Sequence, residues 1–318
     1  MGVTFDTHLT FSPHINSIAD RAASRLRILK SLAGSSWGQQ KETLVFTYKC
    51  LLRPLHTYAA PVWFPNVSDS AVRKLQSTQN SALRIATGSL KMSPIPHLHS
   101  ETKILPVREH LSLLCKQFLV NALRPHHPSR RVVTDNTNRR PRRTPIRYTL
   151  QSKYLPSIQY VLTDGLDTVD QYREAITTLH TDCVRSTLAS FPDNPVLQSP
   201  PPDIHPSEEE LPRVYRTALS QLRSGHSRLL NSYRHRIGIG DSPLCPSCGR
   251  EDHTTSHIFA CTEHPTELTV RDLWERPGRV AHYLGSLPYI DFPALARPPP
   301  ETPLPSRPSL APWDFYSL

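Results

Sequence analysis

The sequence has no long apolar run. Nowhere do its 318 residues approach the 18 or more consecutive apolar residues that a membrane-spanning helix requires. The N-terminus, MGVTFDTHLTF, also lacks the basic-then-apolar pattern of a secretory signal. We therefore expect a protein that is not membrane-bound and that resides inside the cell.

Signatures of several catalytic sites are missing as well. The sequence contains no zinc-protease H-E-x-x-H, no phosphate-binding G-x-x-x-x-G-K-[ST] and no dinucleotide-binding G-x-G-x-x-G. No two aspartates are adjacent, although adjacent aspartates are how a two-metal polymerase holds its magnesium ions. The sequence thus predicts no catalytic residue and no small-molecule substrate.

Hydrophobic residues make up 37% of the chain, which is low for a chain that packs along its whole length. Proline is abundant, and 17 of the 32 prolines lie in the windows 192–212 and 277–312. Because proline breaks helices and removes a backbone donor, we interpret these windows as linkers or tails. Cys50, Cys115 and Cys183 stand alone within apolar helical patterns, which predicts buried free thiols rather than disulfides.

The clearest pattern that is present is a set of metal-ligand residues near the C-terminus, within LCPSCGREDHTTSHIFAC. They follow the spacing C-x2-C-x8-H-x3-C and are Cys245, Cys248, His257 and Cys261. Three thiolates and one imidazole suit a closed, tetrahedral structural zinc site, which leaves no position for a catalytic water. The pattern therefore predicts a zinc-stabilised binding module, in which His253 and His264 compete with His257 for the histidine position.

Positive charge is concentrated in one segment. Residues 124–147 hold eight arginines and one aspartate, which supply +7 of the net charge of +10. The segment is broken by prolines and has no helical period, so we expect an exposed loop. Arginine without lysine favours bidentate phosphate contacts, although a solvated loop or a nuclear-import signal would look the same. The candidate nucleic-acid-binding residues are Arg130, Arg131, Arg139, Arg140, Arg142 and Arg143.

Apolar residues recur with a helical period over most of the first 125 residues. The pattern predicts helices over 14–32, 38–54, 68–88 and 107–123, with Ser68 or Asp69 as a candidate N-cap. Helical patterns return over 166–189 and 208–236. In the last stretch, Glu208–Glu210 suit a helix N-terminus. Its arginines form either a phosphate-facing surface or a solvated face, and they are Arg213, Arg216, Arg223, Arg228, Arg234 and Arg236.

These patterns predict a mainly α protein. Its expected parts are a helical bundle (1–125), an Arg-rich irregular connector (126–150), a helical segment (151–191), a Pro-rich linker (192–212), a helical segment that ends in the CCHC zinc module (213–276), and a disordered Pro-rich tail (277–318).

The opening residues, GVTFDTHLTFSPHI, resemble a family segment. They are similar to the G-V-x-x-D-x-x-L-x-[FW]-x-x-H-I segment just after the polymerase palm in jockey-like non-LTR (LINE-type) retrotransposon reverse transcriptases. RAASRLRILKSLAGSSWG, TYKCLLRPLHTYAAPVW and KLQSTQNSALRIATG resemble the downstream thumb region. ALSQLRSGHSRLLNSYRHRIG, the cysteine-rich stretches and LTVRDLW resemble the C-terminal end of the same proteins. The resemblance covers residues 2 to about 90 and 217–276.

The resemblance implies a thumb-like helical bundle that grips nucleic acid through its backbone, and a zinc-binding end. It assigns Asp6, Trp37, Trp63 and Arg84 to folding. The family's fingers, palm and [FY]-x-D-D motif are absent from the sequence, so the resemblance transfers no catalytic residue. Since Met1 lies inside a polymerase segment, we expect a truncated element copy or an incomplete gene model.

The resulting hypothesis is a protein that binds RNA or DNA, retained from a retrotransposon polymerase and without synthesis of its own. Three alternatives stay open. The chain is an active fragment that needs a partner polymerase chain to supply the palm, a protein-interaction module built on the zinc cluster and proline tail, or a decayed copy without function.

Overall fold

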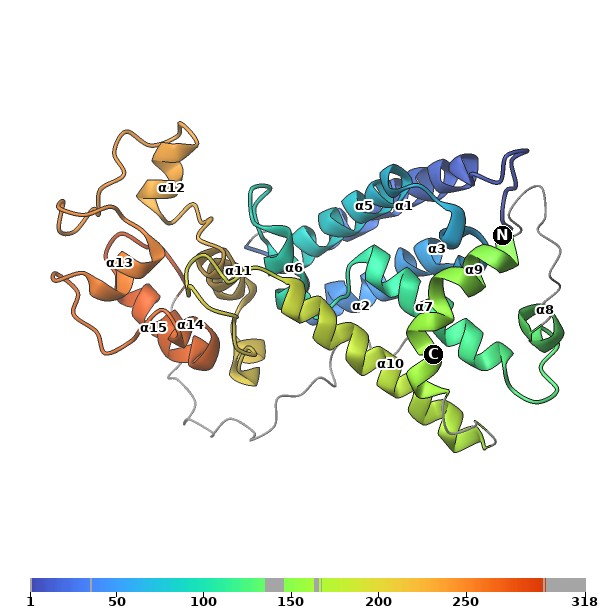
Figure 1. Ribbon diagram of the computed structural model, residues 1–318. Coiled ribbons are helices and arrows are strands. Elements are labelled where there is room, and N and C mark those ends of the chain that lie inside the picture. The colour runs from blue at the N-terminus through green and yellow to red at the C-terminus, as the bar shows by residue number, and fades with distance from the viewer. Residues whose placement is uncertain are drawn as a thin grey trace.

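The computed structural model describes residues 2–34, 36–134, 146–162, 166, 168–293 and 295. Within them the protein is helical and forms no β-strand, which confirms the predicted mainly α class. Two lobes lie side by side (Figure 1). The first lobe contains α1 (Ser12–Leu32), α2 (Lys41–Leu51), α3 (Arg53–Thr57), α4 (Ala60–Trp63), α5 (Asp69–Thr87), α6 (Ile95–Thr102), α7 (Val107–Ala122), α8 (Arg130–Thr134), α9 (Ile146–Tyr154) and α10 (Val169–Ser190). The second lobe contains α11 (Arg213–Arg223), α12 (Asn231–Arg236), α13 (Thr255–Ala260), α14 (Asp272–Glu275) and α15 (Pro277–Ser286).

The first lobe is a helical bundle in which α1 packs along α5. The sequence sets the ends of α5: the Ser68 side chain accepts a hydrogen bond from the Ala71 N–H, and Gly88 ends the helix with a φ of 70°. Trp63 is fully buried in the bundle core. The Asp6 carboxylate accepts hydrogen bonds from the Thr10 and Phe11 backbone N–H groups and so holds the turn before α1. The four helices predicted in this region are confirmed, whereas α3, α4 and α6 are too short to show a period.

The second lobe has its own apolar core, formed by α11, α14 and α15. Leu219, Leu222, Leu273 and Leu284 are fully buried there. The Tyr283 hydroxyl on α15 donates to the backbone oxygens of Ile258 and His264, which attaches the cysteine-rich segment to this core. The metal-ligand residues therefore sit on a packed lobe.

Buried arginines of α11 join the two lobes. Arg213 donates to four backbone carbonyls of the first lobe, among them those of Ile85 and Ala86 in the last turn of α5. Arg216 pairs with Glu42. Arg223 is fully buried, and its partners Glu101 and Glu208 are also buried. Three of the arginines expected on a phosphate-facing or solvated surface are thus internal, because backbone and acidic partners far away in sequence bind them.

Other expectations are corrected by the packing. Glu208 lies in a short 3-10 helix, η3 (Pro206–Glu210), and is buried instead of capping an exposed helix end. In the proline-rich window 192–212, the buried Asn194 side chain donates to the Arg223 carbonyl oxygen, so part of this window is packed. The expected disordered tail begins too early at 277, because α15 is buried through Val280, Ala281 and Leu284. Residues 296–318 lie outside the described residues.

The Arg-rich connector is less irregular than predicted. Helix α8 occupies 130–134 and α9 begins at 146, so both flanks of the segment are helical. Residues 135–145 lie outside the described residues.

Cys115 is buried as predicted, Cys183 is half-buried, and Cys50 is exposed on α2. Across the described ranges, no helix combines the length and the apolar character needed to cross a membrane.

Candidate metal centre

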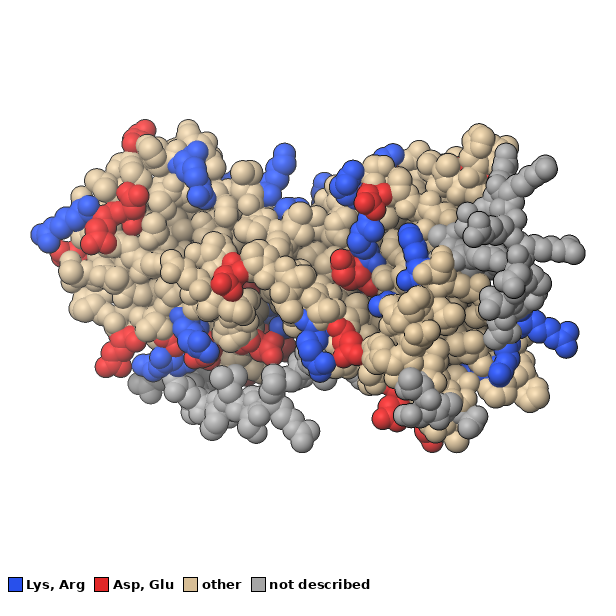
Figure 2. All heavy atoms as spheres, viewed as in Figure 1, with Lys and Arg blue, Asp and Glu red and all other residues tan. Residues whose placement is uncertain are grey.

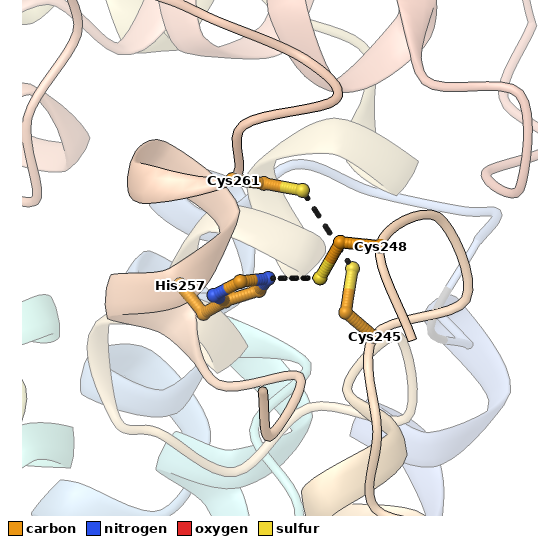
Figure 3. Close-up of side chains that lie close together, drawn as sticks. All are labelled: Cys245, Cys248, His257 and Cys261. Carbon is orange, nitrogen blue, oxygen red and sulfur yellow. Dashed lines mark hydrogen bonds between the residues drawn. The ribbon is translucent and has the colours of Figure 1, made fainter. Parts of the chain in front are cut away.

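The four predicted metal-ligand residues lie together in the second lobe (Figure 3). Cys245 and Cys248 come from the loop between α12 and α13, His257 lies on α13, and Cys261 directly follows that helix. A tight turn places the first two: the Gly249 N–H donates to the Cys245 carbonyl at 2.9 Å, and Gly249 has a φ of 64° that favours glycine. Thr254 caps α13 by accepting from the His257 N–H, which fixes the start of the helix next to the turn.

The distances fit one tetrahedral metal ion. All four ligand atoms lie within 4.8 Å of one another. The Cys245 and Cys261 sulfurs are 3.9 Å apart, and the Cys248 sulfur is 3.3 Å from His257 Nε2. In a tetrahedral zinc site, two sulfurs are about 3.8 Å apart, and a sulfur and a nitrogen about 3.6 Å. The donor set and its spacing are therefore compatible with zinc.

Local electrostatics favour the thiolate form of Cys248, which is the form that binds a cation. The backbone N–H groups of Arg250 and Glu251 point at Cys248 and lower the pKa of its thiol to about 6. Burial raises the pKa of the Cys261 thiol, and the nearby sulfur of Cys245 adds to the rise. Without a cation, three thiolates so close together would repel one another. A divalent ion held by these residues would stabilise all three sulfurs in the deprotonated form.

The structure brings one of the three candidate histidines, His257, next to the sulfurs. His253 is fully buried, and its Nδ1 accepts from the Asn231 N–H at 3.3 Å. Burial lowers the pKa of His253 to about 4, which keeps the ring neutral. His264 Nε2 lies 2.9 Å from the Ser247 hydroxyl. Among the three candidates, His257 alone points at the sulfurs, while the other two support the surrounding fold.

Glu251 is a neighbour of the candidate metal centre that the sequence analysis did not single out. Its carboxylate lies 3.0 Å from His257 Nδ1, while Nε2 of the same ring faces Cys248. A carboxylate behind a ligating histidine fixes the ring orientation and raises its basicity. Glu251 lies within the ligand segment, six residues before His257, and this proximity is the only signal in the sequence. The spacing did not indicate that the two side chains touch.

We expect Glu251→Gln to weaken metal affinity. Outer partners of this kind change affinity by roughly 10- to 100-fold, and the 74% exposure of the Glu251 side chain places the effect near the lower limit. Competition with a chromophoric chelator measures it. Asp252→Asn is the matched control, because this neighbouring carboxylate is exposed and lies outside the ligand group. Equal affinities for the two variants would remove Glu251 from the site.

The predicted nucleic-acid-binding arginines are only partly described. Arg130 and Arg131 are exposed on α8, whereas Arg139, Arg140, Arg142 and Arg143 lie outside the described residues. On the face shown in Figure 2, lysine and arginine side chains are scattered over both lobes and interspersed with acidic ones. This view therefore shows no continuous basic surface.

One stretch formally matches a catalytic pattern: residues 34–38 read G-S-S-W-G, the G-x-S-x-G of serine hydrolases. A nucleophile elbow is a sharp turn between a strand and a helix. Here the stretch follows α1, and the Gly34 N–H donates to the Trp37 carbonyl at 3.1 Å in a turn that leads to α2. It therefore lacks the elbow geometry, and we assign it no catalytic role.

Part of the chain is similar to a curated protein of Drosophila melanogaster, "Probable RNA-directed DNA polymerase from transposon X-element". The two sequences are 27% identical over 143 residues, which is 45% of this chain and 15% of that polymerase. This distant, partial similarity supports an origin related to reverse transcriptases. No protein-family model matches the chain. No solved structure matches it either.

Proposed function

We propose that this chain binds RNA or DNA as a C-terminal part of a jockey-like non-LTR reverse transcriptase and does not synthesise DNA by itself. The observation that carries the proposal is the partial similarity to a transposon RNA-directed DNA polymerase. It agrees with the resemblance of the first 90 residues to the region after the palm. The four grouped ligands of the second lobe then form a structural zinc site, with no position left for substrate.

The charge distribution supports phosphate contact. The chain carries a net charge of +10, and most of it lies in the Arg-rich segment 124–147. Arg130 and Arg131 at the near end of this segment are exposed. Contacts to phosphates depend strongly on salt and depend little on base sequence. We therefore propose that this segment supplies salt-dependent affinity without base specificity.

Fluorescence anisotropy with labelled RNA and DNA across a salt series tests the proposal. We expect R139Q/R140Q and R142Q/R143Q each to weaken binding and to reduce the log–log salt slope by about 1.4 to 1.8, for two lost phosphate contacts. R173Q/R185Q is the matched control, because both arginines are exposed on α10 and pair with acids one helical turn away.

Unchanged affinity in both Arg-rich variants at low salt would remove the segment from the proposed function. If the folded, zinc-loaded protein bound neither RNA nor DNA at low salt, the proposed function itself would fail. A protein-interaction role would then be the better hypothesis.

A further inference from the structure

An open groove lies where the two lobes meet. Its volume is about 480 Å³, and its walls come from the residues after α1, the end of α5 and the residues that follow it, one side of α11, the loop after α11, and Phe292. Helix α11 occupies this junction in Figure 1. Two arginines line the groove, Arg84 from the first lobe and Arg228 from the second, and none of its described lining residues is acidic.

Arg84 is half-buried beside the groove, and its Nε is buried without a hydrogen-bond partner. Among the described residues, no hydrogen bond or ion pair engages its guanidinium, and burial lowers its pKa. The neighbouring arginines of α11 contrast with it, because Arg213 is bound by carbonyls and Arg223 by carboxylates. The buried Thr217 hydroxyl in the same groove also lacks a partner. These groups can receive an anion that the described residues do not supply.

The rest of the groove is largely apolar. Leu90, Val214, Leu229 and Phe292 line it, and the half-buried Phe292 ring packs edge-on against Tyr215 at a centroid distance of 4.6 Å. A ligand that fits must therefore combine negative charge with flat apolar surface. Single-stranded nucleic acid does so, because its phosphates are charged and its unpaired bases stack on aromatic side chains. A duplex hides its base faces and would leave this apolar surface unused.

We propose that the groove between the lobes binds a single strand of RNA or DNA, with phosphates on Arg84 and Arg228 and a base against Phe292. The inference rests on the proposed function and gives it a second contact surface, separate from the Arg-rich segment. The family resemblance assigned Arg84 to folding, but its buried Nε has no hydrogen-bond partner among the described residues and the side chain lines the groove, which favours a binding role.

The test uses the full-length, zinc-loaded chain and labelled oligo(U) and oligo(dT) of about 12 nucleotides, with a duplex of the same length for comparison. We expect R84Q/R228Q to reduce the salt slope by about 1.4, which is the loss of two single-strand phosphate contacts. F292L retains an apolar side chain on Tyr215 and should weaken single-strand binding by roughly tenfold through lost stacking. R234Q is the control, because Arg234 is exposed on α12 outside the groove.

Wild-type affinity in R84Q/R228Q and F292L would overturn the groove site and leave the proposed function standing. Absence of binding by the wild-type chain to every probe would instead refute the proposed function. If R84Q lowers the melting temperature, the groove site is tested with R228Q alone and with F292L. Arg228 is exposed, so its replacement leaves the core intact.

Discussion

Replacing Cys248 with serine is expected to abolish metal binding and to unfold the cysteine-rich segment. Among the described residues, Cys245, Cys248, His257 and Cys261 are the four that group as metal ligands. His253 Nδ1 and His264 Nε2 contact other residues, Asn231 and Ser247. Structural zinc sites in small modules contribute apparent binding free energies of about 10–16 kcal/mol at neutral pH. Metal analysis should fall from one ion per chain to none, and amide exchange should accelerate over 244–264.

The loss of protection from amide exchange should extend through the second lobe but should not reach the first lobe. Tyr283 links α15 to the metal segment through hydrogen bonds to Ile258 and His264, so α15 should lose protection as well. Helices α5 and α7 pack in the cores of the first lobe, which are separate from the core of the second lobe, and should keep their protection from exchange. Cys50→Ser is the matched control, because Cys50 is exposed and isolated. A Cys248→Ser protein that retained one metal ion and unchanged exchange would contradict the site.

Replacing Arg223 with methionine is expected to lower the free energy of unfolding by about 3–5 kcal/mol. The guanidinium is fully buried, and its Nη1 donates to Glu101 Oε1 at 3.0 Å, while Nη2 pairs with Glu208. Lys41 is the second cation of the cluster and lies 3.0 Å from Glu208. Removal of Arg223 leaves two buried carboxylates with Lys41 and with Arg216, whose Nε lies 4.0 Å from Glu208 and which also pairs with Glu42. Glu101 then loses its closest cation, and an undercompensated buried charge is strongly destabilising.

Denaturant unfolding at neutral pH measures the effect, and Arg173→Met provides the control. Arg173 forms an exposed pair with Asp170 at 3.1 Å, and exposed pairs contribute at most about 1 kcal/mol. If both variants lost equally little stability, the buried cluster would not hold the lobes together. The double variant R223M/E101Q should recover part of the loss, since the remaining carboxylate of Glu208 still pairs with Lys41 at 3.0 Å.

The same cluster predicts a pH dependence. Burial by itself would raise the pKa of Glu101, but Arg223 and Lys41 outweigh it and lower the pKa to about 2, below its ordinary value of 4.5. A carboxylate with a lowered folded-state pKa stabilises the fold above its unfolded-state pKa, and this contribution is lost as the pH falls toward the folded-state value. The stability difference between the wild type and Arg223→Met should therefore shrink between about pH 4.5 and pH 2.

Local sequence determined the helices and the ligand set. Helix α5 follows from its apolar period, its Ser68 cap and its Gly88 terminator, all of which act within the helix itself. The metal residues were found because their spacing reflects a turn and one short helix, which bring together residues no more than 16 positions apart. Patterns of this kind are visible in sequence because neighbours along the chain are also neighbours in space.

Only the tertiary structure decided which charged residues are internal. The helical pattern around Arg223 predicts an exposed side chain. Its partner Glu101 is 122 residues away, so the pairing cannot be recognised from neighbouring residues. Cys50 shows the opposite error, because its apolar neighbours suggested burial while the packing of α2 leaves it exposed. The groove with Arg84 and Arg228 exists only because the two lobes meet there. Burial and charge pairing depend on which distant segments meet, and that is set by the packing of the whole chain.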